Sequence, residues 1–239
     1  MTTIYHAWGN GGHKTLRDHA NEEPVDLLVA FPFWKAFEKV RKEYNIGKLA
    51  LDSGAYSAWN SGKKIELVEY NALCKDVECT EIFGLDVIWN PEATQRNLEK
   101  QWSEGIDAIP TFHGGSDWRW LDWAKQRPKI AISNRKANRQ RWMVEVFKRI
   151  FPHRVHGFGI GSRMMLDKVP FHSIDATSWL FRPAATGDWI GYNGKTLAVR
   201  AKGMTDFRIE VEEYQRRSRW AAVRWRNALK QLEGGSLCA

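Results

Sequence analysis

The stretch LALDSGAY at residues 49–56 decides the fold that the sequence predicts, because an apolar run ends there in the carboxylate of Asp52 and then turns at a glycine. Three further apolar runs end in a polar side chain: IFGLDVI at Asp86, AIPTFHGG at His113 and HSIDATSW at Asp175. Side chains this far apart in sequence converge only if successive parallel strands point their carboxyl ends at one mouth, as in a β/α barrel. The pattern therefore predicts an active site at that mouth.

Apolar runs and helical stretches alternate along the chain, which is typical of repeated βαβ units, and the apolar composition of the runs indicates strands covered on both faces. We therefore predict an α/β fold, a TIM-like (β/α)8 barrel that forms one catalytic domain over residues 1–209. The best candidate for the last strand is residues 189–192, and the pattern is compatible with a barrel that is irregular at this strand. The other predicted strands are residues 27–31, 49–51, 82–88, 108–112, 130–132, 155–160 and 171–175, and the predicted helices are residues 32–44, 65–77, 91–104, 118–126, 138–151 and 164–169.

Two helix starts are marked by capping residues. Asn90 precedes Pro91, which places an N-cap side chain before a proline at the first helical position. Asp117 precedes the Trp-rich helix in the same way.

Positive charge is concentrated near the C-terminus. The 239 residues carry a formal net charge of +8 and a pI near 9.4, which favours an anionic partner such as nucleic acid. Residues 210–239 are predicted to form a basic C-terminal helix packed on the barrel within the same domain. Its basic face is either a solvated helix surface or a nucleic-acid clamp. The candidate nucleic-acid-binding residues are Arg216, Arg217, Arg219, Arg224, Arg226 and Lys230.

Other classes of protein are disfavoured. The N-terminus lacks the charged and apolar regions of a signal peptide, and the longest apolar strings are too short to cross a bilayer, so we expect a cytoplasmic protein with no membrane partner. The three cysteines form neither a CxxC pair nor an even set, which argues against disulfides and a four-ligand zinc site. No HxH cluster supports a metal hydrolase, so no metal is predicted.

Asp52, Asp86 and His113 each have a structural alternative to a role in chemistry. Asp52 can exchange a proton at the mouth, or it can cap the following turn. Asp86 presents two oxygens that match the N1–H and N2–H2 donors of guanine, or it forms a structural salt bridge. His113 can donate to a carbonyl oxygen, or it is a structural histidine. Asp175 supplies a second carboxylate across the mouth, and paired carboxylates support chemistry at a glycosidic carbon.

In chain order, LDSGAY, FGLDVI, TFHGG, GFGIG and SIDATSW resemble the core of the tRNA-guanine transglycosylase superfamily. They are most similar to its short viral, DNA-modifying branch, the 7-deazaguanine DNA transglycosylases. The matching span runs from about residue 49 to residue 179. The resemblance implies a pentosyltransferase that removes guanine from a polynucleotide and attaches a 7-deazaguanine to the same C1′, with no cofactor.

The resemblance also implies a role for each motif. Asp175 would be the nucleophile that attacks C1′, and Asp52 would manage the proton on the outgoing and incoming purine. Asp86 would bind the N1 and N2 donors of the base. The base carbonyl would meet His113 and the backbone of the glycine-rich segment, and Tyr56 or Trp179 would stack on the base. The remaining expected substrate-binding residues are Ser53, Gly114, Gly157 and Gly159.

The chain departs from the family pattern at two places. The tRNA enzymes carry a zinc site of three cysteines and one histidine after the nucleophile, whereas here no cysteine follows Asp175 until Cys238, and His113 stands where those enzymes have glutamine. The missing zinc module favours DNA over tRNA as the polymer, in the host cytoplasm if the chain is viral. Exchange on tRNA, hydrolytic removal of a base and a non-catalytic nucleic-acid-binding barrel stay as alternatives, and the sequence predicts no oligomeric state.

Overall fold

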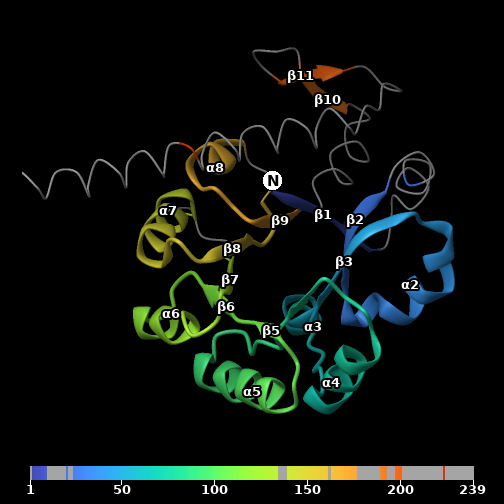
Figure 1. Ribbon diagram of the computed structural model, residues 1–239, viewed down its shortest axis with the longest axis vertical. Coiled ribbons are helices and arrows are strands. Elements are labelled where there is room, and N and C mark those ends of the chain that lie inside the picture. The colour runs from blue at the N-terminus through green and yellow to red at the C-terminus, as the bar shows by residue number, and fades with distance from the viewer. Residues whose placement is uncertain are drawn as a thin grey trace, which may run out of the picture.

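The computed structural model describes residues 2–9, 20, 24–133, 139–160, 163–176, 189–192, 197–200 and 223. Parallel strands form its centre and helices follow most of them (Figure 1). The strands of the main sheet are β1 (Thr3–Trp8), β2 (Val25–Ala30), β3 (Ile46–Asp52), β4 (Glu81–Phe83), β5 (Ala108–Ile109), β6 (Thr111–His113), β7 (Lys129–Ser133), β8 (Arg154–Gly157) and β9 (Ser173–Ala176). The helices are α2 (Trp34–Val40), α3 (Ala55–Asn60), α4 (Leu67–Asp76), α5 (Pro91–Ser103), α6 (Trp118–Ala124), α7 (Arg139–Ile150) and α8 (Arg163–Lys168).

The two end strands of the main sheet, β5 and β6, meet at Pro110. Its strand order is β5-β4-β3-β2-β1-β9-β8-β7-β6, and every pairing is parallel. β5 and β6 are separated by this single proline, which has no N–H to donate. Its carbonyl nevertheless accepts a hydrogen bond from the Ala131 N–H of β7 at 2.8 Å. β5 and β6 are therefore two halves of one strand, and the predicted TIM-like barrel is confirmed, with α2, α4, α5, α6 and α7 arranged around it (Figure 1).

One barrel strand was assigned wrongly from the sequence. Residues 189–192 form β10 (Trp189–Tyr192), which pairs antiparallel with β11 (Leu197–Arg200) in a separate sheet. The barrel position expected for this strand is taken by β1, which lies between β2 and β9. Its sequence, TIYHAW, mixes polar and apolar side chains, so it does not stand out as an apolar run, although five of its six residues are buried.

The predicted capping residues are confirmed. The Asn90 side chain accepts a hydrogen bond from the Ala93 N–H at 3.0 Å, and Asp117 accepts one from the Arg119 N–H at 2.9 Å. Caps of this kind stabilise a helix by about 1 kcal/mol each.

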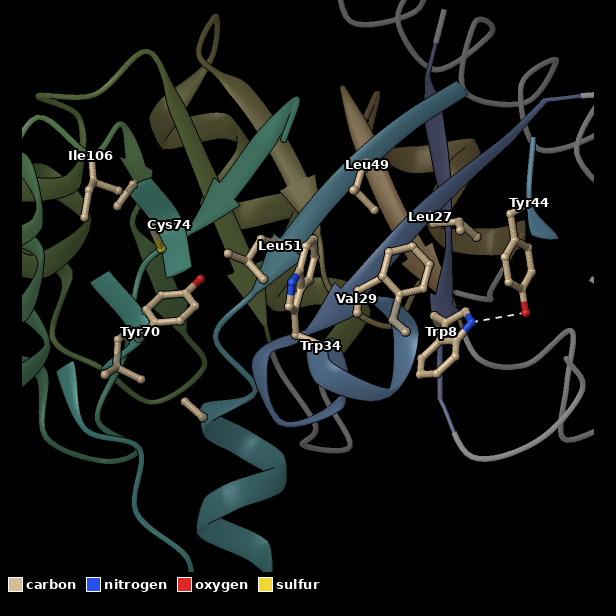
Figure 2. Packing of buried hydrophobic residues seen from close by; sticks show 14 of the residues in the cluster. Trp8, Leu27, Val29, Trp34, Tyr44, Leu49, Leu51, Tyr70, Cys74 and Ile106 are labelled. Carbon is tan, nitrogen blue, oxygen red and sulfur yellow. Dashed lines mark hydrogen bonds between the residues drawn. The ribbon is translucent and has the colours of Figure 1, made fainter. Parts of the chain in front are cut away.

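The strands alternate between two environments. Odd and even residues of a strand face opposite sides, so one set packs against the helices and the other fills the barrel. Figure 2 shows part of the outer set, in which Trp8 Nε1 donates to Tyr44 Oη at 3.2 Å. The inner apolar cluster consists of Tyr5, Leu28, Ala50, Phe83, Ile109 and Ala131, with Phe158 packed against it.

Some predictions fall outside the described residues. Arg216, Arg217, Arg219, Arg224, Arg226, Lys230, Trp179 and Cys238 all lie there. Within the described part, Cys74 and Cys79 are free thiols. No helix in that part is long and apolar enough to span a membrane.

Candidate active site

The carboxyl ends of the barrel strands carry the four predicted side chains. Asp52 and His113 are the last residues of β3 and β6, and Asp175 lies one residue before the end of β9. Asp86 lies in the loop after β4. Because the barrel strands are all parallel, the four positions share one mouth.

Asp52 is the carboxylate with the most perturbed protonation. Its pKa is raised to about 7, chiefly by burial and in addition by the neighbouring carboxylates of Asp86 and Asp175. The backbone N–H groups of Ser53 and Gly54 act against this rise without cancelling it. The mutual repulsion indicates that the three carboxylates share one site. A carboxyl group with a pKa near neutrality can both donate and accept a proton under physiological conditions.

Asp86 and His113 form a pair. Nε2 of His113 lies 2.5 Å from Oδ2 of Asp86, and the Ser53 hydroxyl donates to Oδ1 across 3.5 Å. The Asp86 side chain is 11% exposed and that of His113 is 28% exposed. The N–H of Gly114 donates to the Ser133 carbonyl at 2.8 Å, which continues the sheet rather than leaving a donor open for a ligand. A ligand that binds Oδ2 of Asp86 must therefore displace or share the contact with His113.

The loop that carries Asp86 is held by polar side chains on the inner face of α5. Gln101 accepts from the Leu85 N–H at 3.2 Å, and Asn97 donates to the Leu85 carbonyl at 3.0 Å. The Thr94 hydroxyl accepts from the Val87 N–H at 2.8 Å. Sequence reasoning missed these residues. Their signal was three polar side chains at positions i, i+3 and i+7 of one helix face.

The DSG turn is fixed by close packing. Gly54 has φ 72°, and a Cβ there would lie 2.5 Å from Cδ of Pro32, so only glycine fits. The turn starts α3, which the sequence did not predict, and it directs Tyr56 and Trp59 outward. These side chains belong to residues that are 41% and 49% exposed, with ring centroids 5.9 Å apart.

Gly157, the last residue of β8, and Gly159, which follows the strand, were expected to offer backbone to a ligand, and their surroundings differ from that expectation. Gly159 has φ 60°, and its N–H donates to Oδ1 of Asp175 at 2.9 Å, so this donor serves the carboxylate itself. The Arg139 guanidinium holds the same turn by donating to the carbonyls of Phe158 and Gly159 at 2.7 and 2.9 Å. A Cβ on Gly157 would lie 2.6 Å from the Phe171 ring, so this position is filled by packing rather than open to a ligand.

His156 is a second residue that sequence reasoning missed. It lies on β8 with no exposed surface, and its Nε2 is 3.4 Å from Oδ1 of Asp175. Two features of the sequence could have indicated a role for His156. Side chains alternate between the two faces of a strand, so Ser173 and Asp175 share one face of β9, and a histidine interrupts the apolar residues of β8.

Trp89 is held on the rim in a strained conformation. It is 67% exposed and has φ 64°, a left-handed conformation that bulky residues rarely adopt. The turn is closed by the Asn90 N–H, which donates to the Val87 carbonyl at 2.9 Å. Trp89 borders a groove between α5 and α6 that is also lined by His113 and Trp120. Strain of this kind is concentrated at functional sites.

The described residues include no group of three His, Cys, Asp or Glu side chains placed to hold a metal ion. The site thus consists of Asp52 with a pKa of about 7, the pair of Asp86 and His113, and Asp175, which accepts a hydrogen bond on Oδ1. No family model, no curated protein and no solved structure matches the chain.

Proposed function

We propose that the protein is a base-exchange transglycosylase that replaces guanine in DNA with a 7-deazaguanine derivative through a covalent bond between Asp175 and the sugar. The observation that carries this proposal is the difference between two carboxylates at one mouth. Asp52 has a pKa of about 7, whereas Asp175 accepts a hydrogen bond from the Gly159 N–H on Oδ1. Carboxylates in such different environments are suited to proton transfer and nucleophilic attack, respectively.

The exchange needs only these two groups. A carboxylate oxygen of Asp175 forms a bond to C1′ as the bond from C1′ to the purine nitrogen breaks, and the protonated Asp52 gives its proton to the departing nitrogen. The incoming base then returns a proton to Asp52, its nitrogen bonds to C1′, and Asp175 leaves as a carboxylate. One glycosidic bond replaces another of similar energy, so no cofactor or external energy source is required.

Asp86 and His113 supply the groups for base recognition. A carboxylate accepts from two adjacent N–H donors, which guanine and 7-deazaguanines present on their Watson–Crick edge. When the base occupies Asp86, His113 loses its present partner on Oδ2 and gains the base carbonyl as an acceptor. The exchange of partners keeps both side chains satisfied in the bound state.

The rim and the charge favour a nucleic acid as the polymer. Tyr56 and Trp59 lie on α3, which follows Asp52, and Trp89 lies in the loop that carries Asp86. All three are exposed aromatic residues, and unpaired bases stack on such rings. The target carbon is inaccessible in a stacked duplex, so the nucleotide must be flipped or unpaired. The net charge of +8 supplies affinity for phosphates without specifying DNA or RNA.

Label incorporation tests this proposal. The protein is incubated with a radiolabelled 7-deazaguanine and with duplex DNA, single-stranded DNA or tRNA, and acid-insoluble label is counted. We expect label in DNA, with an equal amount of guanine released. Label in tRNA alone would reassign the polymer, and abasic DNA without label would make the protein a glycosylase. Binding without either product would leave a non-catalytic barrel.

Two variants separate the carboxylate roles. Asp175→Ala abolishes both guanine release and label incorporation, because no nucleophile remains. Asp52→Asn keeps the nucleophile but lacks the exchangeable proton, so both steps slow by about 10²- to 10⁴-fold. Asp76→Asn, on an exposed aspartate at the end of α4, serves as a control with unchanged activity.

A further inference from the structure

A line of polar side chains crosses the barrel interior and ends at Asp175. Lys129 of β7 pairs with Glu81 of β4, and its Nζ donates to Ser173 Oγ at 2.9 Å. Ser173 Oγ lies 2.9 Å from Nδ1 of His156, and Nε2 of His156 lies 3.4 Å from Oδ1 of Asp175. Every member of this line is largely shielded from water, so its geometry is set by protein contacts.

His156 stands within the apolar layer of the barrel. Its ring centroid is 4.4 Å from that of Phe83, 4.6 Å from that of Phe158 and 6.4 Å from that of Tyr5. A side chain enclosed on these sides has little freedom to turn. The ring therefore holds its two nitrogens in fixed directions, one toward Ser173 and one toward Asp175.

Burial keeps this imidazole neutral. It lowers the pKa of His156 below the usual value, and the positive charge of Lys129 acts in the same direction. The carboxylates of Asp175 and Glu81 oppose this change without overcoming it. A neutral imidazole has one N–H donor and one acceptor nitrogen, so the tautomer decides what Asp175 receives.

The neighbouring donors select the tautomer. Lys129 has only protons to offer, so Ser173 Oγ accepts from it and keeps one hydroxyl proton to donate. That proton has two acceptors within reach, Nδ1 of His156 at 2.9 Å and Oε2 of Glu81 at 3.3 Å, and the first is closer. Nε2 then carries the ring proton. The opposite tautomer would turn a lone pair toward a carboxylate oxygen, which is repulsive.

Among the described residues, two groups contact the carboxylate of Asp175, and both reach the same oxygen. The Gly159 N–H and the His156 Nε2 both lie against Oδ1, and no described residue hydrogen-bonds to Oδ2. We infer that His156 is a positioning residue that, with Gly159, holds Oδ1 so that Oδ2 is the oxygen presented to the sugar carbon. The catalytic meaning of this inference rests on the proposed function, whereas the contacts to Oδ1 do not.

Two variants of His156 make a matched kinetic test. The amide nitrogen of glutamine reaches the position of Nε2 and still faces Oδ1 of Asp175, whereas asparagine reaches only the position of Nδ1. His156→Gln should retain kcat within about 5-fold of the wild type, and His156→Asn should lower kcat by about 10²-fold, the loss typical of a displaced reacting group. KM for the 7-deazaguanine should stay unchanged in both, since neither variant alters Asp86. Equal losses in the two variants, or a change confined to KM, would overturn the positioning role.

A spectroscopic measurement tests the arrangement without any activity. In protein labelled with ¹⁵N-histidine, the His156 nitrogens should report protonated Nε2 and unprotonated Nδ1, with no change as the pH is lowered through the usual histidine pKa of 6.5. Ser173→Ala removes the donor to Nδ1 and should shift the His156 signals toward a mixture of tautomers. Protonated Nδ1 in the wild type, or no response to Ser173→Ala, would refute the inference.

The two proposals fail in different ways. A protein that shows no base exchange but has protonated Nε2 overturns the proposed function and leaves the arrangement around Asp175 intact. A protein that exchanges bases with protonated Nδ1 keeps its function and loses His156 as the positioning residue.

Discussion

The high pKa of Asp52 has a consequence for stability that can be measured directly. The folded protein keeps this carboxyl protonated up to about pH 7, whereas an unfolded chain releases the proton near pH 3.8. Between these values the folded state binds more protons, so its stability falls as pH rises. The stability is fully present below pH 3.8 and is lost once the pH passes about 7.

The size of the effect follows from the same pKa. A rise from 3.8 to about 7 corresponds to at most about 4 kcal/mol at 1.36 kcal/mol per pH unit. The side chain is partly exposed, so we halve this to about 2 kcal/mol for solvent screening. Asp52→Asn removes the ionisation and keeps an oxygen that accepts from the turn backbone. The variant should therefore match the wild type at about pH 3, below the unfolded pKa, and be about 2 kcal/mol more stable at about pH 7.5.

Urea unfolding at several pH values measures this difference, provided that the slope with denaturant is the same for both proteins. The comparison must be between variant and wild type, because burial lowers the pKa of His172 to about 4 and gives the whole protein an opposing slope. Asp76→Asn is the control and should show a difference that does not vary with pH. A stability difference for Asp52→Asn that is equal at about pH 3 and about pH 7.5 would refute the reasoning.

Three further predictions concern the rim, the loop and the charge. Trp89→Gly should stabilise the fold by about 1 kcal/mol, measured by urea unfolding, because glycine adopts the left-handed backbone without strain. It should also weaken the binding of single-stranded DNA by about 10-fold through lost stacking, measured by fluorescence anisotropy, and an unchanged DNA affinity would remove Trp89 from the interface. The control Val68→Ala, on an exposed apolar residue of α4, should change neither stability nor DNA affinity. Thr94→Val should cost about 1–3 kcal/mol because the Val87 N–H loses its acceptor, whereas Thr94→Ser should stay near wild type; equal losses would show that the hydroxyl is unimportant. Arg216→Ala should reduce the slope of log affinity against log salt by about 1 if this residue contacts a phosphate, and an unchanged slope would favour a solvated helix face.

The order of the strands, and the placement of four polar side chains at one end of the barrel, could be predicted because each signal was local. An apolar run that ends in Asp52, His113 or Asp175 marks a strand end, whereas Asp86 lies in the loop after β4. Parallel strands bring these ends to one mouth. The cap at Asn90 is a local signal of the same kind and is confirmed. What these side chains bind stays a prediction.

The features that were missed depend on contacts distant in sequence. β1 lacks a continuous apolar run, and only its pairing with β2 and β9 makes it a barrel strand. The need for glycine at Gly157 comes from the ring of Phe171, which no spacing within the GFGIG segment indicates. The role of His156 depends on Ser173 and Asp175, and it emerges only when β8 and β9 are seen side by side.

The central claim is that Asp175 becomes covalently bonded to the sugar of a nucleotide while Asp52 handles the proton. Mass spectrometry of a denatured mixture of protein and guanine-containing DNA, quenched before any 7-deazaguanine is added, tests it most directly. The account predicts a protein–DNA adduct located on the peptide that contains Asp175, absent in Asp175→Ala and still formed, more slowly, in Asp52→Asn. An adduct on another residue, or guanine release by the wild type with no adduct at any time, would contradict it.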